Sequence, residues 1–344
     1  MVFVRGRAVK LDIVAFTARG AALAEKLLEL YPSSCAVAPQ NYCNGQLQPL
    51  SYLHDWTHAR FQTGRTLVFI GAAGIAVRAI APFVSNKASD AAVICIDEGG
   101  ENIIPLLSGH IGGANRVARE LAKELGGRAI ITTATDLSGV FAVDDWAARS
   151  NCVVANVSVI KDISAALLDG KTVGLRSDFP ITGELPRGVC DDPAAYYGVE
   201  LALLGTAPFP CTLHVMPRII VAGIGCRRGI APDVLKARLR EALKLASLPI
   251  EAVGIVASID IKAGELGLHT LCDSINAKFI TFTAEELMSV QGEFEKSERV
   301  LNATGADNVC QRAVSCAGAR LITGKIAGEG VTVALGILDW EVRF

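Results

Sequence analysis

One pattern recurs along this chain: a short apolar run, a turn of glycine or polar residues, and then an amphipathic stretch. Residues 11–16 form the first run, and three leucines share one helical face in the stretch that follows. Residues 66–70 begin the second, whose helix ends before Pro82 because proline disfavours helical backbone in the residue preceding it. Strands that alternate with helices across short turns predict an α/β fold.

Two further runs extend this predicted sheet. The run "AVICI" within residues 90–100 is unbroken, as expected for a strand covered on both faces. A helix follows, with its apolar stripe between Val117 and Leu125 and Gly126 as its stop. The next run, "RAIITTATD", ends in polar residues. We therefore expect a parallel sheet over roughly residues 11–140.

The pattern is interrupted once and then restarts, which indicates the domain organisation. Residues 1–140 form the predicted N-terminal α/β domain. Residues 141–217 contain short strand-like runs broken by proline and glycine, and we interpret them as a small middle region with a linker. From residue 218 the strand, glycine turn and helix return, so 218–344 is a second α/β domain. The predicted fold is thus two α/β domains with largely parallel sheets, joined by a small middle region.

Charge and hydropathy exclude some classes of function. The 344 residues include 33 Lys and Arg and 35 Asp and Glu, for a formal net charge of −2. Such a balance creates no field that would gather nucleic acid, so no nucleic-acid partner is expected. The most apolar window, residues 66–84, contains Arg78 and Pro82, which favours a buried strand, a turn and a short helix over a membrane span.

The N-terminus and the cysteines indicate a cytoplasmic protein. Asp12 interrupts the first apolar stretch and no small-residue cleavage site follows, which argues against a signal peptide. The ten cysteines are scattered and form no C-x-x-C pair. We expect reduced, buried thiols, with neither a disulfide framework nor a zinc site.

One turn has the composition of a ligand site. Ser108-Gly109-His110-Ile111-Gly112-Gly113-Ala114-Asn115 follows an apolar run and opens a helix. Glycines let a backbone approach a ligand, and free N–H groups at a helix N-terminus favour a carboxylate or phosphate. His110 is able to act as an acid or a base near neutral pH. The alternative is a tight turn whose histidine caps the helix or fills space.

Polar residues also follow two predicted strands. Asp97 and Glu98 come after "AVICI", at the kind of strand end where open α/β sheets bind ligands, and would orient a histidine or hold a proton. Thr132, Thr133 and Asp136 would offer hydroxyls and a carboxylate to the same edge. The alternatives are solvated acids in the first case and the N-cap of the next helix in the second.

Cationic residues supply the remaining candidates. Arg78 lies in an apolar helix, where an unpaired charge is costly, so it needs either an internal acid or a substrate carboxylate. A later glycine turn carries Arg227 and Arg228, which suit carboxylates. Lys262 and Glu265 follow the next predicted strand, and for them a surface ion pair is the alternative.

The glycine turn at 223–229 lacks the spacing of a dinucleotide loop. Its pattern is G-x-G-x-x-x-G rather than G-x-G-x-x-G, and the next strand ends further on than the usual ribose-binding acid. The chain also lacks H-E-x-x-H, G-x-S-x-G and G-x-x-x-x-G-K-[ST]. Nicotinamide and flavin enzymes, zinc proteases, serine hydrolases and P-loop proteins are therefore disfavoured.

Several segments together resemble the cobalt-precorrin-5A hydrolase family, CbiG, of anaerobic cobalamin biosynthesis. In family order over nearly the whole chain they are "AAGIAVRAIAP", "LLSGHIGGAN", "TTATD", "FAVDDWA", "VAGIGCRRG" and "ASIDIKAGELGL". The resemblance implies an N-terminal domain, a short middle region and a C-terminal domain like the cobalamin-pathway protein CobE. One departure lies in "NVCQRAVS", where Gln311 stands at the position at which the family usually has a glutamate.

The resemblance also implies a reaction. The family opens the δ-lactone on ring A of cobalt-precorrin-5A and releases a two-carbon fragment as acetaldehyde, giving cobalt-precorrin-5B. The cobalt belongs to the substrate, so no cofactor and no protein-bound metal are expected. The implied partners are corrinoid intermediates, with neighbouring enzymes of the pathway as further candidates.

For such a reaction, His110 is the predicted general base, and Glu98 and Asp136 are further candidates for proton transfer. Backbone N–H groups of the glycine turn would stabilise charge on the lactone oxygen. The arginines and Lys262 would anchor the acetate and propionate groups of the substrate. The predicted substrate-binding residues are Arg78, Ser108, Gly109, Gly112, Gly113, Asn115, Thr132, Thr133, Arg227, Arg228, Lys262 and Glu265.

Two other functions fit the residues. One is a non-catalytic protein that shelters or hands on unstable tetrapyrrole intermediates, with both domains acting as a clamp. The other is an unrelated α/β enzyme whose glycine turns hold a phosphate ligand. Acetaldehyde formation distinguishes the hydrolase from the first, and corrinoid binding distinguishes it from the second.

Overall fold

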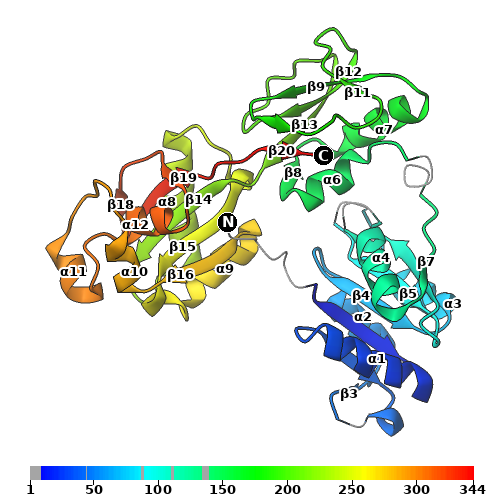
Figure 1. Cartoon of the computed structure of the whole chain (residues 1–344). Coiled ribbons are helices and arrows are strands. Elements are labelled where there is room, and N and C mark those ends of the chain that lie inside the picture. Colours follow the sequence, from blue (N-terminus) through cyan, green and yellow to red (C-terminus); the bar gives the residue numbers. More distant parts are fainter. Residues whose placement is uncertain (1–8, 44, 87–88, 110–111, 134–138) are drawn as a thin grey trace. The chain divides into compact units, whose positions relative to one another are not determined.

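The computed structural model describes residues 9–43, 45–86, 89–109, 112–133 and 139–344 (Figure 1). The chain divides into two compact units, residues 1–148 and 149–344. Both units contain strands that alternate with helices. Most neighbouring strands run parallel in the seven-stranded and five-stranded sheets, whereas the six-stranded sheet combines parallel and antiparallel pairs. The predicted α/β fold class with largely parallel sheets is therefore confirmed.

The first unit contains a seven-stranded sheet with the order β3-β2-β1-β4-β5-β6-β7. Its strands are β1 (Leu11–Ala15), β2 (Cys35–Ala38), β3 (Gln48–Pro49), β4 (Thr66–Ile70), β5 (Ala92–Ile96), β6 (Asn102–Leu107) and β7 (Arg128–Ala129). Its helices are α1 (Ala18–Leu30), η1 (Gln40–Tyr42), α2 (Leu53–Arg60), α3 (Ala73–Ile80) and α4 (Ala114–Leu125), and α6 (Val143–Arg149) ends at the boundary between the units. Apolar cores form on both faces, with α1 and α4 on one and α2 and α3 on the other.

The predicted apolar stripe positions α4 as expected. Val117, Ala118 and Leu121 are almost completely buried against the sheet. The helix stops at Gly126, whose φ of +72° is the left-handed conformation that glycine adopts without strain. The predicted helix and its stop are confirmed.

The direction of β6 differs from the prediction. β5 and β6 pair antiparallel, with Val93 opposite Leu107 and Ile96 opposite Ile103, whereas β7 runs parallel to β6. The cause is the short connection between them, because a tight turn joins antiparallel strands and a parallel pair needs a longer crossover. A wholly parallel sheet over residues 11–140 is therefore wrong, and β6 ends at the edge of the sheet where β5 begins.

The second unit begins with a five-stranded sheet of the order β11-β9-β12-β13-β8. Its strands are β8 (Cys152–Val154), β9 (Val173–Ser177), β11 (Val189–Cys190), β12 (Tyr197–Leu201) and β13 (Cys211–Pro217), and its helical segments are η2 (Val157–Val159) and α7 (Ile160–Leu168). β9, β11, β12 and β13 are parallel, and only β8 joins β13 antiparallel. The segment predicted as a small middle region thus contains a sheet of its own.

The same unit contains a second sheet of the order β16-β15-β14-β19-β17, with β18 paired to β19. Its strands are β14 (Ile220–Cys226), β15 (Val253–Ile259), β16 (Lys278–Phe282), β17 (Arg320–Leu321), β18 (Ile326–Gly328) and β19 (Val331–Ile337). Its helices are α8 (Pro232–Leu245), η3 (Ile250–Ala252), η4 (Asp260–Lys262), α9 (Leu266–Ile275), α10 (Ala284–Ser289), α11 (Glu298–Thr304) and α12 (Val309–Cys316). β14, β15 and β16 are parallel to one another, so their carboxyl ends share one edge.

Helices cover both faces of this second sheet. α8 and α9 enclose one core, and α10 and α12 enclose the other. α12 lies so close to β14 that a Cβ atom at Gly223 would come within 1.8 Å of the Cys310 carbonyl oxygen. Glycine is therefore required at position 223 for helix packing.

The last residues of the chain pair with a short strand that follows β9 in the same unit. β20 (Val342–Arg343) pairs with β10 (Ile181–Thr182), and Val342 is completely buried. The Trp340 ring meets that of Phe179 edge to face, with 5.0 Å between their centroids. The C-terminal segment thus fastens residues 177–182 to the end of the chain.

The predictions on membrane spans, metal sites and cysteines can each be compared with the structure. No described helix is long and apolar enough to cross a membrane. Within the described ranges, no three histidine, cysteine or acidic side chains are arranged to hold a metal ion. The ten cysteines are free thiols; Cys95, Cys272 and Cys310 are buried, whereas the other seven are partly exposed, so the prediction that they are buried is wrong for most of them.

Candidate active site

The turn after β6 and the segment after β7 lie together at one edge of the first sheet. Because β6 and β7 are parallel, both end at this edge. The side-chain amide of Asn115 donates a hydrogen bond to the Thr133 hydroxyl at 2.9 Å. The Ser108 hydroxyl donates to the Asp90 carbonyl oxygen at 3.0 Å, just before β5 begins. We call this group, Ser108, Gly109, Asn115 and Thr133, the turn edge.

Close packing explains the glycines of this turn. A Cβ atom at Gly109 would lie 2.6 Å from Asn115 Oδ1, and one at Gly112 would lie 2.5 Å from Ser108 Cβ. Gly113 precedes the first residue of α4 with φ +79°, a left-handed conformation. These glycines are therefore needed for the turn to fold around Asn115, which is only 4% exposed.

The backbone of the turn partly satisfies the start of α4. Ala114 N–H donates to the Ser108 carbonyl at 3.1 Å, and Asn115 N–H donates to the Gly109 carbonyl at 2.9 Å. The first helical N–H groups are the usual anion donors of a helix N-terminus. The N–H groups of Ala114 and Asn115 are thus already used within the turn.

Three other predicted residues belong to these two segments by sequence. Thr132 is exposed. His110 and Asp136, the predicted proton-transfer residues, lie outside the described residues, and their roles stay predictions. Their described neighbours Gly109 and Thr133 belong to the turn edge, so both predicted residues are close in sequence to the same group.

Asp97 and Glu98 lie at the opposite edge of the sheet. The reversed direction of β6 puts the length of β5 between them and the turn edge, a separation of about 20 Å at ~3.3 Å per residue. The prediction that these acids lie at the same edge of the sheet as Ser108 and Asn115 is therefore wrong. Sequence reasoning failed here because it assigned β6 the same direction as β5.

The carboxylate of Asp97 has a structural task. It accepts hydrogen bonds from Gly99 N–H at 2.8 Å, Glu101 N–H at 3.2 Å, and the Asn102 backbone and side-chain nitrogens at 2.6 and 2.8 Å. Burial raises the pKa of Asp97, but these hydrogen bonds outweigh it, so the pKa lies below its usual value. Asp97 therefore holds the turn between β5 and β6, and Glu98 is partly exposed beside it.

Arg78 does not lie in the apolar setting that its sequence predicts. α3 turns Arg78 to solvent together with Val77, which is 50% exposed. The guanidinium donates to the Gly74 carbonyl of the same helix at 3.2 Å. An exposed arginine needs no internal acid, so the argument from an unpaired buried charge is wrong.

Four predicted residues do meet in the second unit, at the carboxyl edge of β14 and β15. Arg227 and Arg228 follow β14 and are exposed, whereas Lys262 and Glu265 follow β15. Gly229 N–H donates to Glu265 Oε1 at 2.8 Å, which joins the two loops. We call this region, residues 227–229 and 260–266, the cationic edge.

Lys262 and Glu265 form an ion pair that is largely withdrawn from solvent. Lys262 Nζ lies 3.2 Å from Glu265 Oε2, and the side chains are 12% and 10% exposed. Burial raises the pKa of Glu265, but the Gly229 hydrogen bond, Lys262 and the field of Arg228 outweigh it, so the pKa is lowered. Both carboxylate oxygens are engaged, so Glu265 serves to hold the loops rather than to present a free oxygen to a ligand.

Three family models match successive segments of the chain. Models described as cobalamin synthesis G N-terminal, cobalamin biosynthesis central region and cobalamin synthesis G C-terminus match residues 55–136, 141–198 and 220–336. The cobalt-precorrin-5A hydrolase of Salmonella typhimurium is 35% identical over 348 residues, covering 94% of this chain and 97% of that protein. The chain belongs to the CbiG family.

Other relatives cover the chain to a similar extent. The cobalt-precorrin-5A hydrolase of Priestia megaterium is 26% identical and covers 96% of this chain and 95% of its own. A crystal structure of a cobalamin biosynthesis protein G homolog from Sulfolobus solfataricus is 21% identical, with a TM-score of 0.42, and covers 95% of this chain and 97% of its own.

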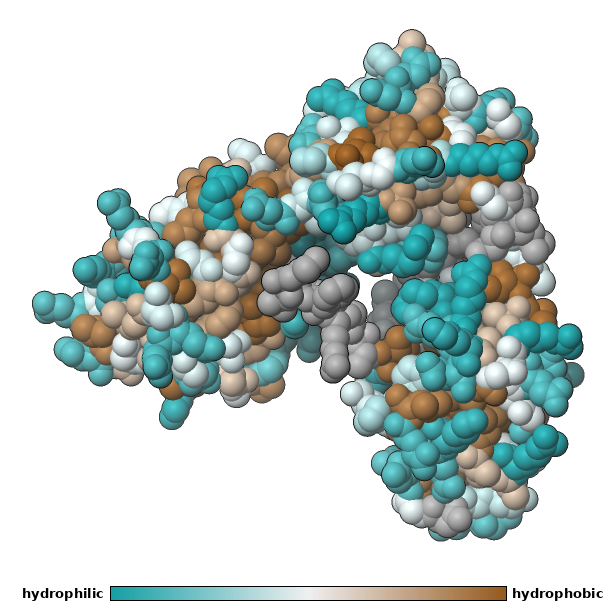
Figure 2. All heavy atoms as spheres, viewed as in Figure 1, coloured by the Kyte–Doolittle hydropathy of each residue, from teal (hydrophilic) through white to brown (hydrophobic). Residues whose placement is uncertain are grey.

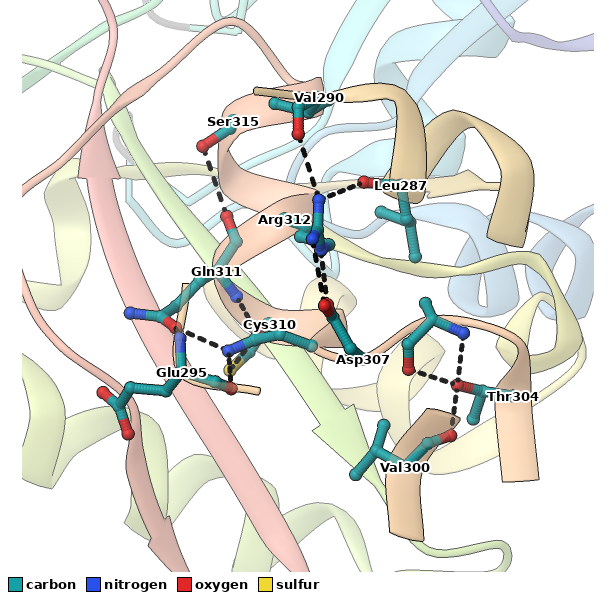
Figure 3. A network of polar contacts seen from close by, with 12 residues as sticks. Leu287, Val290, Glu295, Val300, Thr304, Asp307, Cys310, Gln311, Arg312 and Ser315 are labelled. Carbon is teal, nitrogen blue, oxygen red and sulfur yellow. Dashed lines mark hydrogen bonds and ion pairs between the residues drawn. The ribbon is translucent and has the colours of Figure 1, made fainter. Parts of the chain in front are cut away.

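Gln311, which replaces the glutamate expected from the family resemblance, holds a loop in place (Figure 3). Its Oε1 accepts from Glu295 N–H at 2.9 Å and from the Asn308 side-chain amide at 2.5 Å. Asn308 caps α12 in turn by accepting from Gln311 N–H at 2.9 Å. Gln311 is 5% exposed, and its oxygen links the backbone at Glu295 to the Asn308 amide at the start of α12, which also donates to the Glu295 carbonyl at 2.9 Å.

The next residue along α12 completes this network. Arg312 Nε and Nη2 lie 2.6 and 3.1 Å from the two Asp307 oxygens, and Nη1 donates to the Leu287 and Val290 carbonyls. The hydrogen bond from Arg312 holds the pKa of Asp307 below its usual value. The polar groups of Asp307 and Arg312 are hydrogen-bonded within the domain, so these residues stabilise its core rather than bind a ligand.

Sequence reasoning missed two buried acids of the first unit. Asp90 accepts from Ser85 and Asn86 N–H groups, and so fixes the loop to which Ser108 is bonded. Asp12 is 1% exposed and pairs with Arg65 at 2.7 Å. An acid inside an apolar strand was a visible signal for Asp12, because such a charge needs a partner. The sequence gives no comparable signal for Asp90.

Proposed function

We propose that this chain hydrolyses cobalt-precorrin-5A, opening the ring A δ-lactone and releasing acetaldehyde to give cobalt-precorrin-5B. The observation that carries this proposal is the 35% identity with a cobalt-precorrin-5A hydrolase over nearly the full length of both chains. A second support is that the two segments of the family resemblance after β6 and β7 are joined by the bond between Asn115 and Thr133.

The first step requires a water molecule and a base. Water attacks the lactone carbonyl, its oxygen bonds to the carbon, and the ring C–O bond breaks to leave a carboxylate and a hydroxyl group. We assign the proton acceptor to His110, because imidazole titrates near neutral pH. Gly112 and Gly113, beside it in sequence, are the proposed N–H donors to the oxyanion, since the Ala114 N–H is already bonded.

The second step requires two proton transfers. The hydroxyl of the two-carbon fragment loses its proton, its oxygen forms the aldehyde C=O bond, and the C–C bond breaks. The electron pair of that bond moves to the macrocycle, which takes up a proton. We assign these transfers to His110 and Asp136. Glu98 is left out of this site, because it lies at the other edge of the sheet.

The substrate brings its own cobalt, so we propose no resident metal and no other cofactor. Its peripheral carboxylates need cations, and Arg227 and Arg228 are the exposed guanidinium groups among the predicted anchors of the second unit. Lys262 is less available, because it is paired with Glu265. We also propose a cytoplasmic location, which the ten free thiols support.

The decisive experiment measures acetaldehyde. Cobalt-precorrin-5A is incubated with the purified protein under anaerobic conditions, and acetaldehyde is quantified with a coupled alcohol dehydrogenase while the corrinoid product is identified by mass spectrometry. Stoichiometric acetaldehyde with a matching loss of mass supports the hydrolase. A shift of the corrinoid absorption without acetaldehyde would instead support a non-catalytic carrier.

A further inference from the structure

The cationic edge has two guanidinium groups that no internal contact uses. Arg227 and Arg228 are exposed, and within the part of the chain that the structure describes their side chains form no hydrogen bond or ion pair. Arg312 and Arg238 of the same unit are paired with Asp307 and Glu241, whereas the exposed arginines Arg240 and Arg299 lie apart from each other in the sequence. Arg228 lies close enough to Glu265 to lower its pKa, but no hydrogen bond or ion pair among the described residues occupies either guanidinium group, so both are available to an external anion.

The loop that carries these arginines is fixed by hydrogen bonds from both sides. Arg227 N–H donates to the Gly330 carbonyl at 3.0 Å, and Gly229 N–H donates to Glu265 at 2.8 Å. The aliphatic part of Arg227 also lies against Gly330, where a Cβ atom would be 2.9 Å from Arg227 Cδ. A fixed backbone lowers the entropy lost when the side chains bind a ligand.

Two large apolar side chains are exposed on the same edge. Ile261 is 58% exposed and Leu266 is 78% exposed, the largest exposure among the described large hydrophobic residues. Gly267 packs against the Ile230 carbonyl, where a Cβ atom would be only 2.4 Å away, so the start of α9 lies directly beside the arginine loop. Leu266 therefore neighbours the loop that carries Arg228.

The exposure of an apolar residue does not by itself indicate a binding site. In the view of Figure 2, hydrophobic residues (brown) are scattered among hydrophilic ones (teal). This is usual, because apolar atoms make up much of the surface of folded proteins. The cationic edge differs because its apolar residues flank, in sequence, an ion pair that is largely withdrawn from solvent, and because this loop is bonded to the loop that carries Arg227 and Arg228. This combination suits a ligand with an apolar face and anionic groups at its rim.

We propose that the cationic edge binds the rim of the corrinoid, with Arg227 and Arg228 each taking a peripheral carboxylate and Ile261 and Leu266 contacting the ring. Glu265 is a positioning residue, which ties the loop of the arginines to Lys262. The identity of the ligand as a corrinoid rests on the proposed function. The inferred chemistry, a flat amphipathic polycarboxylate, comes from the residues of the edge.

The test uses the full chain and uroporphyrin III, a metal-free tetrapyrrole octacarboxylate, with binding followed by absorbance and fluorescence. The double variant Arg227→Ala/Arg228→Ala is compared with Arg240→Ala/Arg299→Ala, which removes two exposed arginines elsewhere in the same unit. We expect the first double variant to raise Kd about 10- to 100-fold and to weaken its dependence on salt. The control should stay within about twofold of the wild type.

A second arm tests the apolar contact. Leu266→Ser removes an exposed side chain, so it should leave folding intact while raising Kd about three- to tenfold without changing the salt dependence. A tetracationic porphyrin of similar ring size should bind the wild type much more weakly than uroporphyrin. Failure of the wild type to bind uroporphyrin, or equal binding by the arginine double variant, would overturn the proposal.

The two proposals fail in different ways. If acetaldehyde is released and the arginine double variant keeps the wild-type KM, the cationic edge is not the binding site and the hydrolase stands. If no acetaldehyde is formed but uroporphyrin binding depends on Arg227 and Arg228, the hydrolase fails and the binding site stands.

Discussion

The turn edge and the cationic edge are built in opposite ways. At the turn edge the described polar groups bond to one another, as Ser108 does to Asp90 and Asn115 to Thr133. At the cationic edge an internal ion pair fixes the loops, and the exposed side chains of Arg227 and Arg228 form no hydrogen bond or ion pair with any described residue. One region has its polar groups satisfied by the fold, and the other presents unsatisfied charge outward.

The difference separates two tasks of an enzyme. A catalytic turn needs closely packed supporting residues, and among the described residues of the turn Gly109 and Gly112 pack tightly against Asn115 and Ser108. A binding surface needs charges free to meet a ligand. We therefore expect substitutions at the turn edge to change kcat or stability, and substitutions of the two arginines to change KM.

The largest effect is expected from His110→Asn. Loss of a general base lowers kcat by about 10²- to 10⁴-fold, with little change in uroporphyrin binding. Acetaldehyde release measures the first quantity and circular dichroism checks the fold. His58→Asn, which changes an exposed histidine of α2, is the matched control. A kcat within about twofold of the wild type would remove His110 as the base.

A smaller effect, on stability, distinguishes the two glycine turns. In Gly112→Ala the new methyl group would lie 2.5 Å from Ser108 Cβ, and we expect a loss of about 1–3 kcal/mol. Gly229→Ala has φ +73° but nothing within 4 Å, so the loss should be only about 1 kcal/mol. Urea unfolding of both variants provides the measurement. Equal losses would contradict the view that the turn edge is the more tightly packed.

Sequence patterns predicted the strands and helices well where an apolar stripe determines them. The boundaries of β4 match residues 66–70, and α4 ends at Gly126 as expected. They failed for the direction of β6, because strand direction depends on the connection and on the partner strand rather than on the strand's own residues. That single error placed the glycine turn after β6 at the same edge as Asp97 and Glu98, which do follow β5 as predicted.

The candidate site was predictable in part. Lys262 and Glu265 were predicted to bind substrate, with a surface ion pair as the alternative, and the structure shows an ion pair whose burial depends on packing that no spacing reveals. The glycines at 109 and 112 were noted for approach to a ligand, whereas their close neighbours are Asn115 and Ser108. Such contacts join residues that the chain brings together only after it folds.

Acid should weaken the cationic edge through Glu265. Its pKa is lowered in the folded state, so its contribution to stability is present above the unfolded value, about 4.3, and is lost as the pH falls through the folded value. Glu265→Gln should cost about 1 kcal/mol at pH 7 and should flatten the stability profile below pH ~5. Glu251→Gln, at an exposed glutamate, is the control. An unchanged acid limb in Glu265→Gln would contradict the assignment.

The smallest effect is expected from Gln311→Glu. This variant tests whether the second unit, which carries the cationic edge, only binds substrate and takes no part in catalysis. The carboxylate keeps an acceptor for Glu295 N–H and the Asn308 amide, and the N-terminus of α12 favours its charge, which offsets part of the burial cost. We expect a change in stability below about 1 kcal/mol and a kcat within about twofold of the wild type.

Gln311→Leu is the matched comparison, because it has a similar size and no acceptor. It removes an acceptor from the Glu295 N–H and from the Asn308 amide, although that amide keeps its bond to the Glu295 carbonyl, and it should cost about 1–2 kcal/mol. Together the two variants separate the structural task of the Gln311 oxygen from any task of a charge at this position. A rise in kcat of tenfold or more in Gln311→Glu would show that the second unit takes part in proton transfer. It would contradict the view that the turn edge performs catalysis and the cationic edge only binds.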